Sequence, residues 1–410
     1  MNRLGVALAF GGLILIGLGS GATGVLIPYQ MADYHVDKVV VGLLFFAFSG
    51  GYVLSGIANG PLIHGLGTRG QLTLGASVYL TTALGTWLHP SFPLLVAATL
   101  AIGFGTGVLD AGLNAYVTTL PGHTALLNYL HAFFGVGALL GPLLAAQIVY
   151  RHLPWQDTYL VLAVVSVPLL LGFAVVFPRW AQPVTNNGAG TNDEVGTDDE
   201  VGTDDEAGAG VHLTRALRHP AVGLAALFLC LYVGVEVTVG NWSFSLLTQV
   251  NGQGNLLAGY VVSGYWLGLT IGRFLINDLT TRAGLSLTRM MYGCLAGVIL
   301  AVLLTWWSPT GPVAALGFAL VGFFLGPVFP TTIAVTPQLL PERLVSSAIG
   351  LLLGASVVGG AVFPWLAGAI AQGLGLRTLL PYLLVLAAAQ SGGWWAIARR
   401  LRSGTPVPAG

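Results

Sequence analysis

Residues 93–120 read PLLVAATLAIGFGTGVLDAGLNAYVTTL, a long and mostly apolar run. Its only charged side chain is Asp110. A helix rises about 1.5 Å per residue, so a run of this length crosses the roughly 30 Å of hydrocarbon in a bilayer. We therefore expect a membrane-spanning helix here, with one acid deep inside it.

Runs of the same kind recur along the whole chain. Of its 410 residues, 55% are hydrophobic and 7% are charged, whereas about a quarter of a soluble domain is charged. The sequence predicts an all-α membrane protein and excludes an ordinary cytosolic enzyme. We expect twelve transmembrane helices, at 4–30, 39–63, 70–88, 93–120, 125–149, 156–178, 221–249, 255–276, 288–307, 312–339, 344–371 and 378–398.

The placement of the basic residues predicts the orientation in the membrane. When the twelve spans are laid out alternately, three of the 15 Lys and Arg fall on one side: Lys38, Arg151 and Arg377. The other twelve fall on the opposite side, and cytoplasmic loops are the ones enriched in Lys and Arg. We therefore expect a multi-pass protein of the cell membrane with both termini in the cytoplasm.

One polar segment divides the chain. Residues 179–220 contain three related acidic units that begin at Gly190, Gly196 and Gly202. Their composition predicts a disordered cytoplasmic linker, with a cation-binding or partner-binding acidic tract as the alternative. It separates two six-helix bundles, at 1–178 and 221–410.

The two predicted bundles resemble each other in sequence. Gly51-Tyr52 through Thr68-Arg69 matches Gly264-Tyr265 through Thr281-Arg282 at a constant offset of 213 positions. Two further glycine patterns match in the same order: Gly103 and Gly107 with Gly322 and Gly326, and Gly137 and Pro142 with Gly359 and Pro364. The fold we expect is therefore two pseudo-symmetric bundles of equal topology.

This arrangement resembles the major facilitator superfamily, whose substrates bind between two bundles that alternate in access. That superfamily carries a Gly, an acid, a Gly and an Arg between its second and third helices. The corresponding residues here are Gly60, His64, Gly67 and Arg69. His64 replaces the acid, so the latch ascribed to that acid would work differently in this chain.

Two acids remain inside predicted spans, Asp110 and Glu236. Of the 15 acidic residues, eight lie in the linker and five lie at loops or helix ends. An ionised acid at membrane depth costs about 2.5–3.5 kcal/mol. Either these carboxyl groups face a watery cavity and carry a proton, or a neighbouring helix satisfies them as neutral acids. Because Arg273 falls near a predicted helix end, we expect no cationic partner and interpret both acids as proton-coupling groups.

The neighbours of Asp110 suit a solvated cavity. Asn114 follows it by one helical turn, on the same face as Gly103 and Gly107. On the next helix Asn128 and His131 repeat the polar spacing, and His131 is a candidate for relaying a proton. Hydrogen bonding between the two helices, purely for packing, is the alternative for Asn128 and His131.

Amide and aromatic side chains gather near Glu236. They are Asn241, Trp242, Tyr265 and Trp266. Sugars present flat apolar faces ringed by hydroxyl groups, which suits rings combined with amides. With Asn114 and Asn128, these four are the predicted substrate-binding residues, although rings also form belts at membrane interfaces.

Several motifs together resemble the fucose and glucose/mannose proton symporters, with likeness to sodium-dependent glucose transporters. They are GFGTGVLDAGLN (103–114), LYVGVE (231–236), YWLG (265–268) followed by Gly272-Arg273, and FPTT (329–332). The resemblance implies sugar import coupled to a proton through Asp110. Fucose members carry an acid before the pattern VLIP at 25–28, where this chain has Gly24, so the glucose/mannose pattern fits better.

Two other function classes stay open. The pattern GALLGP (137–142) resembles the fifth-helix motif of antiporters that export drugs or metabolites. A non-transporting receptor or a lipid scramblase is the third class. We find no enzyme motif and expect no cofactor, metal or nucleic acid. We expect a monomer whose partners are the bilayer, a small-molecule substrate and H⁺.

Overall fold

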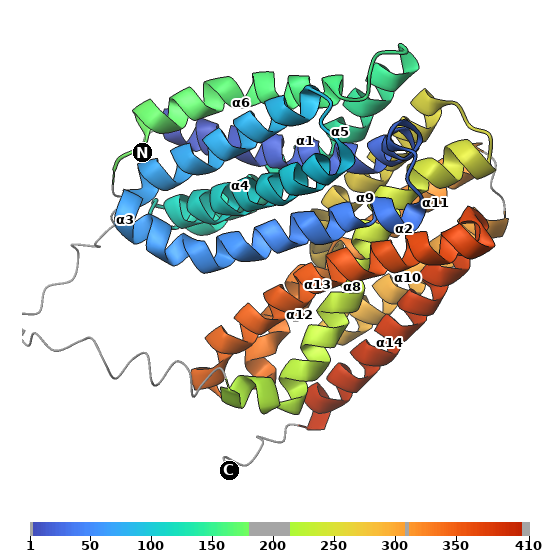
Figure 1. Cartoon of the computed structure of the whole chain (residues 1–410). Coiled ribbons are helices and arrows are strands. Elements are labelled where there is room, and N and C mark those ends of the chain that lie inside the picture. Colours follow the sequence, from blue (N-terminus) through green and yellow to red (C-terminus); the bar gives the residue numbers. More distant parts are fainter. Residues whose placement is uncertain (1–2, 180–213, 308–310, 404–410) are drawn as a thin grey trace, which may run out of the picture.

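The computed structural model describes residues 3–179, 214–307 and 311–403, and these residues are almost entirely helical (Figure 1). The predicted linker falls mostly on residues 180–213, which lie outside the described ones. The helices before it are α1 (Arg3–Tyr34), α2 (Lys38–Val41), α3 (Leu43–Trp87), α4 (Phe92–Thr118), α5 (His123–Tyr150) and α6 (Asp157–Val176).

The helices after the linker repeat the series. They are α8 (Pro220–Ser245), continued by a π-helical turn (Leu246–Val250), α9 (Asn255–Arg282), α10 (Leu287–Trp307), α11 (Gly311–Leu325), α12 (Val328–Val335), α13 (Glu342–Leu374) and α14 (Leu379–Ser403). Short 3₁₀ turns precede α13 and α14, at Thr336–Leu339 and Leu376–Thr378.

The helix α3 contains two of the predicted spans. Its backbone leaves the helical conformation at Gly67, where φ is 69° and ψ is 176°, a region open in practice only to glycine. Two residues later the Arg69 Nε donates to the Phe177 carbonyl at 2.7 Å and ties this bend to the end of α6. The bend at Gly67 therefore separates the second predicted span from the third without an intervening loop.

The structure confirms the predicted fold of twelve spans. Within the described residues, nine segments are long and apolar enough to cross a membrane by length and composition. One of these is α3, which counts twice because of its bend, and α11 with α12 makes one span. The more polar helices α9 and α14, of 28 and 25 residues, complete the set.

The repeated glycines make equivalent contacts in the two groups of helices. A side chain at Gly137 would overlap the Ile14 carbonyl where α5 crosses α1, and one at Gly359 would overlap the Cys230 carbonyl where α13 crosses α8. Without a hydrophobic driving force between helices in lipid, such close backbone approach is a main source of association. The sequence repeat is thus a repeat of helix crossings.

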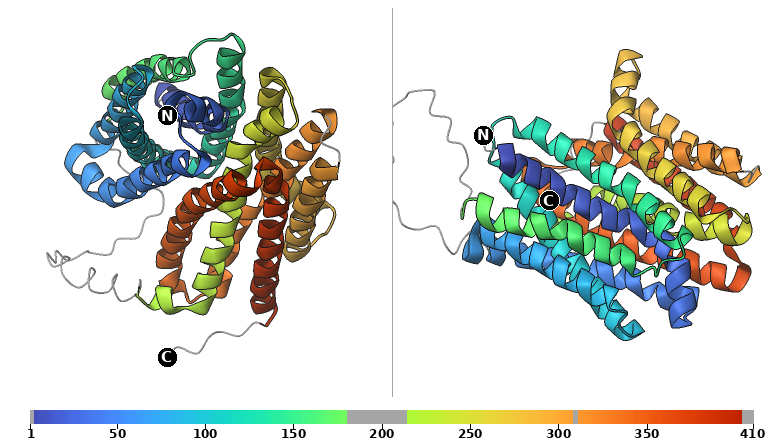
Figure 2. Two further views of the ribbon diagram at one scale, coloured as in Figure 1. Left: turned by 45° about the vertical axis from the view of Figure 1, so that its right-hand side comes forward. Right: turned by 90° about the horizontal axis from the view of Figure 1, so that it is seen from above.

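The two groups meet at one end and separate at the other (Figures 1 and 2). They touch along α1 and α8, α3 and α13, and α5 and α9. At the end near α2 the two groups are in direct contact. The Lys38 backbone N–H donates to the Gln372 side chain at 3.2 Å, and the ring centroids of Phe46 and Trp365 are 5.7 Å apart. The helices diverge toward the end where the chain enters and leaves the linker (Figure 1).

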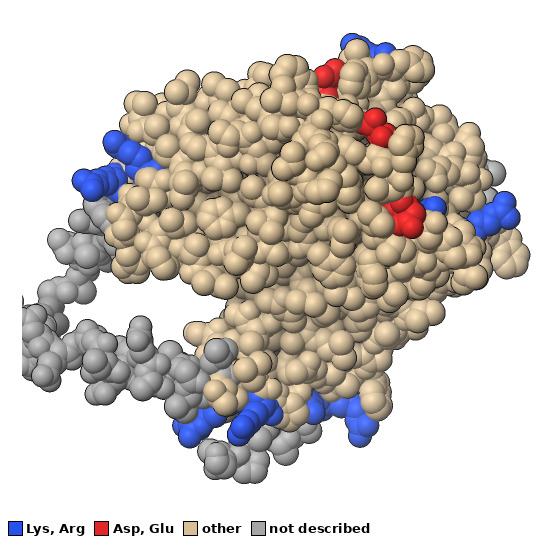
Figure 3. All heavy atoms as spheres, in the orientation of Figure 1, with Lys and Arg blue, Asp and Glu red and all other residues tan. Residues whose placement is uncertain are grey.

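The surface matches this description. In Figure 3 a notch separates the two groups on the diverging side, and charged side chains on this face lie toward the ends of the molecule. The broad band between them is uncharged, as a bilayer requires.

Candidate functional site

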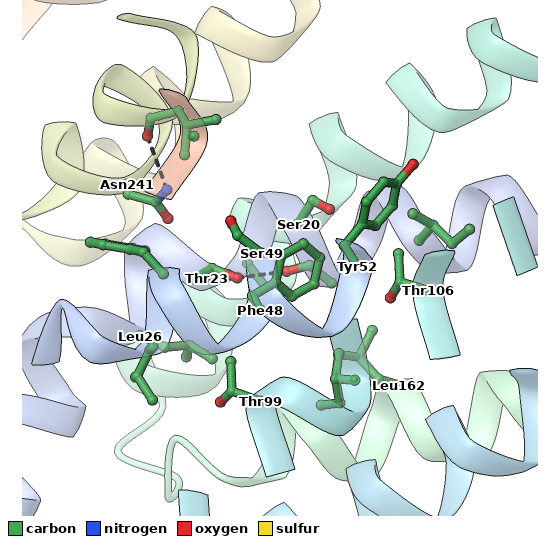
Figure 4. Close-up of a pocket in the computed structure, with 18 of the residues that line it drawn as sticks. Ser20, Thr23, Leu26, Phe48, Ser49, Tyr52, Thr99, Thr106, Leu162 and Asn241 are labelled. Atoms are coloured by element: carbon green, nitrogen blue, oxygen red, sulfur yellow. Dashed lines mark hydrogen bonds between the residues drawn. The ribbon is translucent and has the colours of Figure 1, made fainter. Parts of the chain in front are cut away.

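A cavity of about 280 Å³ lies between the two groups of helices, about midway along them. Hydroxyl side chains line its first wall, in spaced pairs on three helices: Ser20 and Thr23 on α1, Ser49 and Tyr52 on α3, and Thr99 and Thr106 on α4. Figure 4 shows these side chains around one space, with the amide of Asn241 on its other side.

The second wall comes from α8, α9 and α13, and it is mostly apolar. Val233, Val237 and Val357 line it, and Asn241 and Trp266 supply its polar groups. The Asn241 Nδ2 donates to the Val237 carbonyl at 2.9 Å, which leaves the amide oxygen as the acceptor for a ligand. The cavity is therefore hydroxyl-rich on one side and apolar on the other.

The hydroxyl groups of the first wall are oriented by their own helices. Thr23 donates to the Gly19 carbonyl at 3.0 Å, and Thr99 donates to the Leu95 carbonyl at 2.8 Å. A hydroxyl that has donated its hydrogen still carries acceptor lone pairs. This wall consequently offers acceptors to the hydroxyl hydrogens of a ligand.

Asp110 lies directly behind this wall. The Tyr52 hydroxyl donates to its Oδ2 at 2.6 Å, and the Asn114 Nδ2 donates to its Oδ1 at 2.9 Å. Asn114 meets Asp110 because the two are one turn apart on α4, as the sequence pattern predicts. Tyr52 lines the cavity while its hydroxyl touches Asp110, so it connects the cavity to the acid.

His131 lies between the two groups of helices. Its side chain is exposed, and it interacts electrostatically with Asp110 on α4 and with Arg273 on α9. Asn128, one turn earlier on α5, is also exposed. Neither residue lines the cavity, so Asn128 lies outside the predicted substrate site and His131 acts on Asp110 only through its electrostatic interaction.

Glu236 has a cationic neighbour, contrary to our expectation. The side chain of Arg273 on α9 interacts electrostatically with Glu236 and lies near the Tyr232 hydroxyl. The bounds of α9 explain the error, because the helix continues to Arg282 and brings Arg273 well inside it. Within the described residues the two side chains form no ion pair shorter than 4 Å.

The predicted aromatic residues divide into two kinds. Trp266 lines the cavity, whereas Trp242 and Tyr265 are buried in helix packing with exposures of 1% and 0%. The Trp242 Nε1 donates to the Pro364 carbonyl at 2.8 Å, and the Tyr265 hydroxyl donates to the backbone carbonyl of Glu236 at 2.9 Å. Trp242 and Tyr265 therefore brace α8 against its neighbours.

Sequence reasoning missed the hydroxyl wall, since none of its six residues was a predicted site residue. A usable signal existed, because Ser20 and Thr23, like Ser49 and Tyr52, are three residues apart on one helical face. Gln30 at the closed end of the cavity was also missed. In the part of the chain that the structure describes, no three His, Cys, Asp or Glu side chains are grouped as a metal site needs.

Comparison with known proteins gives relatives over nearly the whole chain. The Bypass of stop codon protein 6 of Saccharomyces cerevisiae is 28% identical, over 91% of this chain and 78% of its own. The Glucose/mannose transporter GlcP of Bacillus subtilis is 23% identical over 90% of each chain. A Glucose/galactose transporter of Brucella abortus is 24% identical over 86% of this chain and 84% of its own.

Solved structures share the fold. A bacterial homologue of the human lysosomal transporter Spinster, in an inward-facing conformation, superposes with a TM-score of 0.76 at 15% identity, over the full length of both chains. A D-xylose–proton symporter gives 0.75 at 13% identity, over 98% of this chain and 99% of the symporter. The model of the Major Facilitator Superfamily matches residues 9–364. The resemblance drawn from the sequence is confirmed: the chain belongs to the Major Facilitator Superfamily and is a secondary transporter, not an enzyme.

Proposed function

We propose that this transporter takes up a hexose-type sugar together with a proton, by alternating access. The cavity supports this substrate class because its hydroxyl wall can hydrogen-bond the hydroxyl groups of a pyranose, while its apolar wall can pack against the apolar face of the ring. Relatives named as transporters of glucose, mannose and galactose support it independently.

The observation that carries the proposal is the contact between Tyr52 and Asp110. One end of this tyrosine lines the cavity and the other donates to the carboxylate. A substrate that moves the Tyr52 ring therefore changes the hydrogen bonding of Asp110. In this mechanism the acid takes up a proton on the outer side and releases it on the inner side, and Tyr52 couples that event to substrate binding.

His131 is the proposed relay between Asp110 and water. Its side chain is exposed and interacts electrostatically with Asp110, and an imidazole ring can both accept and donate a proton. Glu236 fits a different role, because it interacts electrostatically with the cationic side chain of Arg273. We therefore propose Asp110 as the proton carrier, and Glu236 as a partner of Arg273 that affects substrate binding from outside the cavity lining.

We propose that the structure represents the inward-facing conformation, in which the open end faces the cytoplasm. The open end of the molecule is the end to which the linker and both termini connect, and the sequence pattern assigns that end to the cytoplasm. The closed end near Lys38 then faces the outside of the cell membrane. Rocking of the two groups about the cavity would open this end and close the other.

Transport by the purified protein in proteoliposomes tests the proposal. An inward proton gradient should drive accumulation of a labelled hexose above its outside concentration, and a protonophore should abolish it. Accumulation that requires a sodium gradient would replace the proton in the scheme. Absence of hexose flux under every gradient would contradict the substrate class.

Export of a drug or metabolite was suggested by the pattern GALLGP at 137–142, and helix packing offers another reason for these residues. Gly137 and Gly141 on α5 pack against the carbonyl groups of Ile14 and Leu18 on α1, and Pro142 lies against Gly21. Because helix packing accounts for these residues, they give no specific support to drug or metabolite export. A receptor or a scramblase would give no gradient-driven uptake in the same assay.

A further inference from the structure

Two residues that line the cavity each carry a buried polar atom without a hydrogen-bond partner among the residues that the structure describes. These atoms are the Oε1 of Gln30 on α1 and the Nε1 of Trp266 on α9. Gln30 is 2% exposed and Trp266 is 7% exposed. Buried polar groups in folded proteins are almost always hydrogen-bonded, so an unpaired one at a cavity wall indicates a place for a ligand.

Each atom is held in place by its neighbours. The Tyr159 hydroxyl, which also lines the cavity, hydrogen-bonds the Gln30 side chain and leaves Oε1 as the unpaired atom. The Trp266 ring packs over Gly240 and meets the Tyr265 ring edge to face, with centroids 5.2 Å apart. The two side chains are therefore positioned before a ligand arrives, which lowers the cost of binding.

The two atoms have opposite hydrogen-bonding character. An amide oxygen only accepts, and an indole N–H only donates. They also lie on opposite groups of helices and at different heights. The Trp266 ring packs over Gly240, which meets Gly24 on α1, and Gln30 lies six residues, roughly 9 Å, beyond Gly24 along that helix. A ligand that satisfies both must carry a donor and an acceptor at separate positions, as a ring with several hydroxyl groups does.

We propose that Gln30 and Trp266 determine specificity, each reading a different hydroxyl group of the transported sugar. Gln30 accepts a hydrogen bond from one hydroxyl and Trp266 donates one to another. Because the two residues belong to different groups of helices, a sugar with both hydroxyls links α1 to α9, and a sugar lacking either one does not. This inference rests on the proposed function and adds the residues that choose among hexoses.

The test combines variants of the protein with sugars that lack single hydroxyl groups. Binding to the purified full chain is measured by calorimetry, first for D-glucose, D-mannose, D-galactose and L-fucose, and then for the singly deoxygenated forms of the tightest binder. The variants are Gln30→Leu and Trp266→Phe, each of which removes one hydrogen-bonding atom. Gln30→Met is a second variant in case Gln30→Leu does not fold.

The chain offers matched controls on α14. Gln390 and Trp394 are both 0% exposed, they too carry unpaired polar atoms, and they do not line the cavity. Gln390→Leu and Trp394→Phe therefore repeat the same chemical changes away from the site. They should leave sugar binding unchanged.

In the wild type, removal of either of two hydroxyl groups should weaken binding about tenfold or more, the effect of one lost hydrogen bond. Gln30→Leu should cancel the penalty for one of these analogues, and Trp266→Phe should cancel it for the other. If the variants keep both penalties, or weaken all analogues equally, the inference is wrong while sugar transport stands. If the wild type binds none of the sugars, the proposed function fails, and this inference fails with it.

Discussion

Asp110 and Glu236 lie well inside spanning helices of opposite groups, but their surroundings differ. Asp110 receives hydrogen bonds from the neutral side chains of Tyr52 and Asn114. Glu236 interacts electrostatically with Arg273, although these two described side chains form no ion pair shorter than 4 Å. The hydrogen-bond donors of Asp110 are neutral, so its carboxyl group can change its protonation without stranding a fixed positive charge, whereas protonation of Glu236 leaves Arg273 without its negative partner. Two acids with the same signal in the sequence are therefore suited to different work.

The largest expected effect is that of Asp110→Asn. The amide keeps the shape of the side chain but cannot bind and release a proton, so gradient-driven accumulation should be lost. Sugar exchange without a gradient should continue. Both are measured in proteoliposomes, with Glu236→Gln as the comparison, which should keep accumulation but weaken substrate binding. Normal accumulation by Asp110→Asn would remove Asp110 from the coupling mechanism.

Neutralising either Glu236 or Arg273 should destabilise the protein, because the two side chains interact electrostatically. Arg273→Gln or Glu236→Gln alone leaves the other charge uncompensated and should cost about 2 kcal/mol, less than full burial would, because both side chains are partly exposed. The double variant should recover most of the loss, as measured by thermal unfolding in detergent. Simple addition of the two losses would mean that the residues do not act as a pair.

Tyr52→Phe tests the connection between the cavity and Asp110. It removes one hydrogen bond to a carboxylate and should lower proton-driven uptake about tenfold. Tyr265→Phe is the matched control, because the Tyr265 hydroxyl donates to the backbone carbonyl of Glu236 and Tyr265 does not line the cavity. Equal losses in the two variants would indicate general damage to packing and no specific link to Asp110.

The smallest effect is expected from His131→Gln. A relay sets the rate of proton exchange but not the driving force, so the initial rate of uptake should fall a few-fold while the final accumulation stays the same. A time course of labelled sugar uptake distinguishes these quantities. A lower plateau would instead assign His131 to the coupling step together with Asp110.

The fold was predictable because it depends on local sequence. Spanning length, the glycines at helix crossings and the recurrence of Gly103 as Gly322 are all visible in the chain. The contact of Asn114 with Asp110 was also predictable, because one helical turn separates them. The bend of helix α3 at Gly67 was predictable too, because it lies in the loop signature that contains Gly60, Gly67 and Arg69.

The partners of the acids were not predictable in the same way. Tyr52 is 58 positions from Asp110, and nothing in either segment alone says that the two side chains meet. Trp242, Tyr265 and Trp266 look alike in the sequence, but only their packing decides that Trp266 lines the cavity while the other two brace α8.

Twelve membrane crossings, an internal repeat and membership of a superfamily of transporters could all be read from the sequence, because apolar length and helical spacing are properties of single segments. Which polar groups meet became known only from the packing of the helices. In a low-dielectric interior the behaviour of a polar or charged group depends on its immediate neighbours. For Asp110, Glu236 and Gln30 these include Tyr52, Arg273 and Tyr159, which lie on other helices.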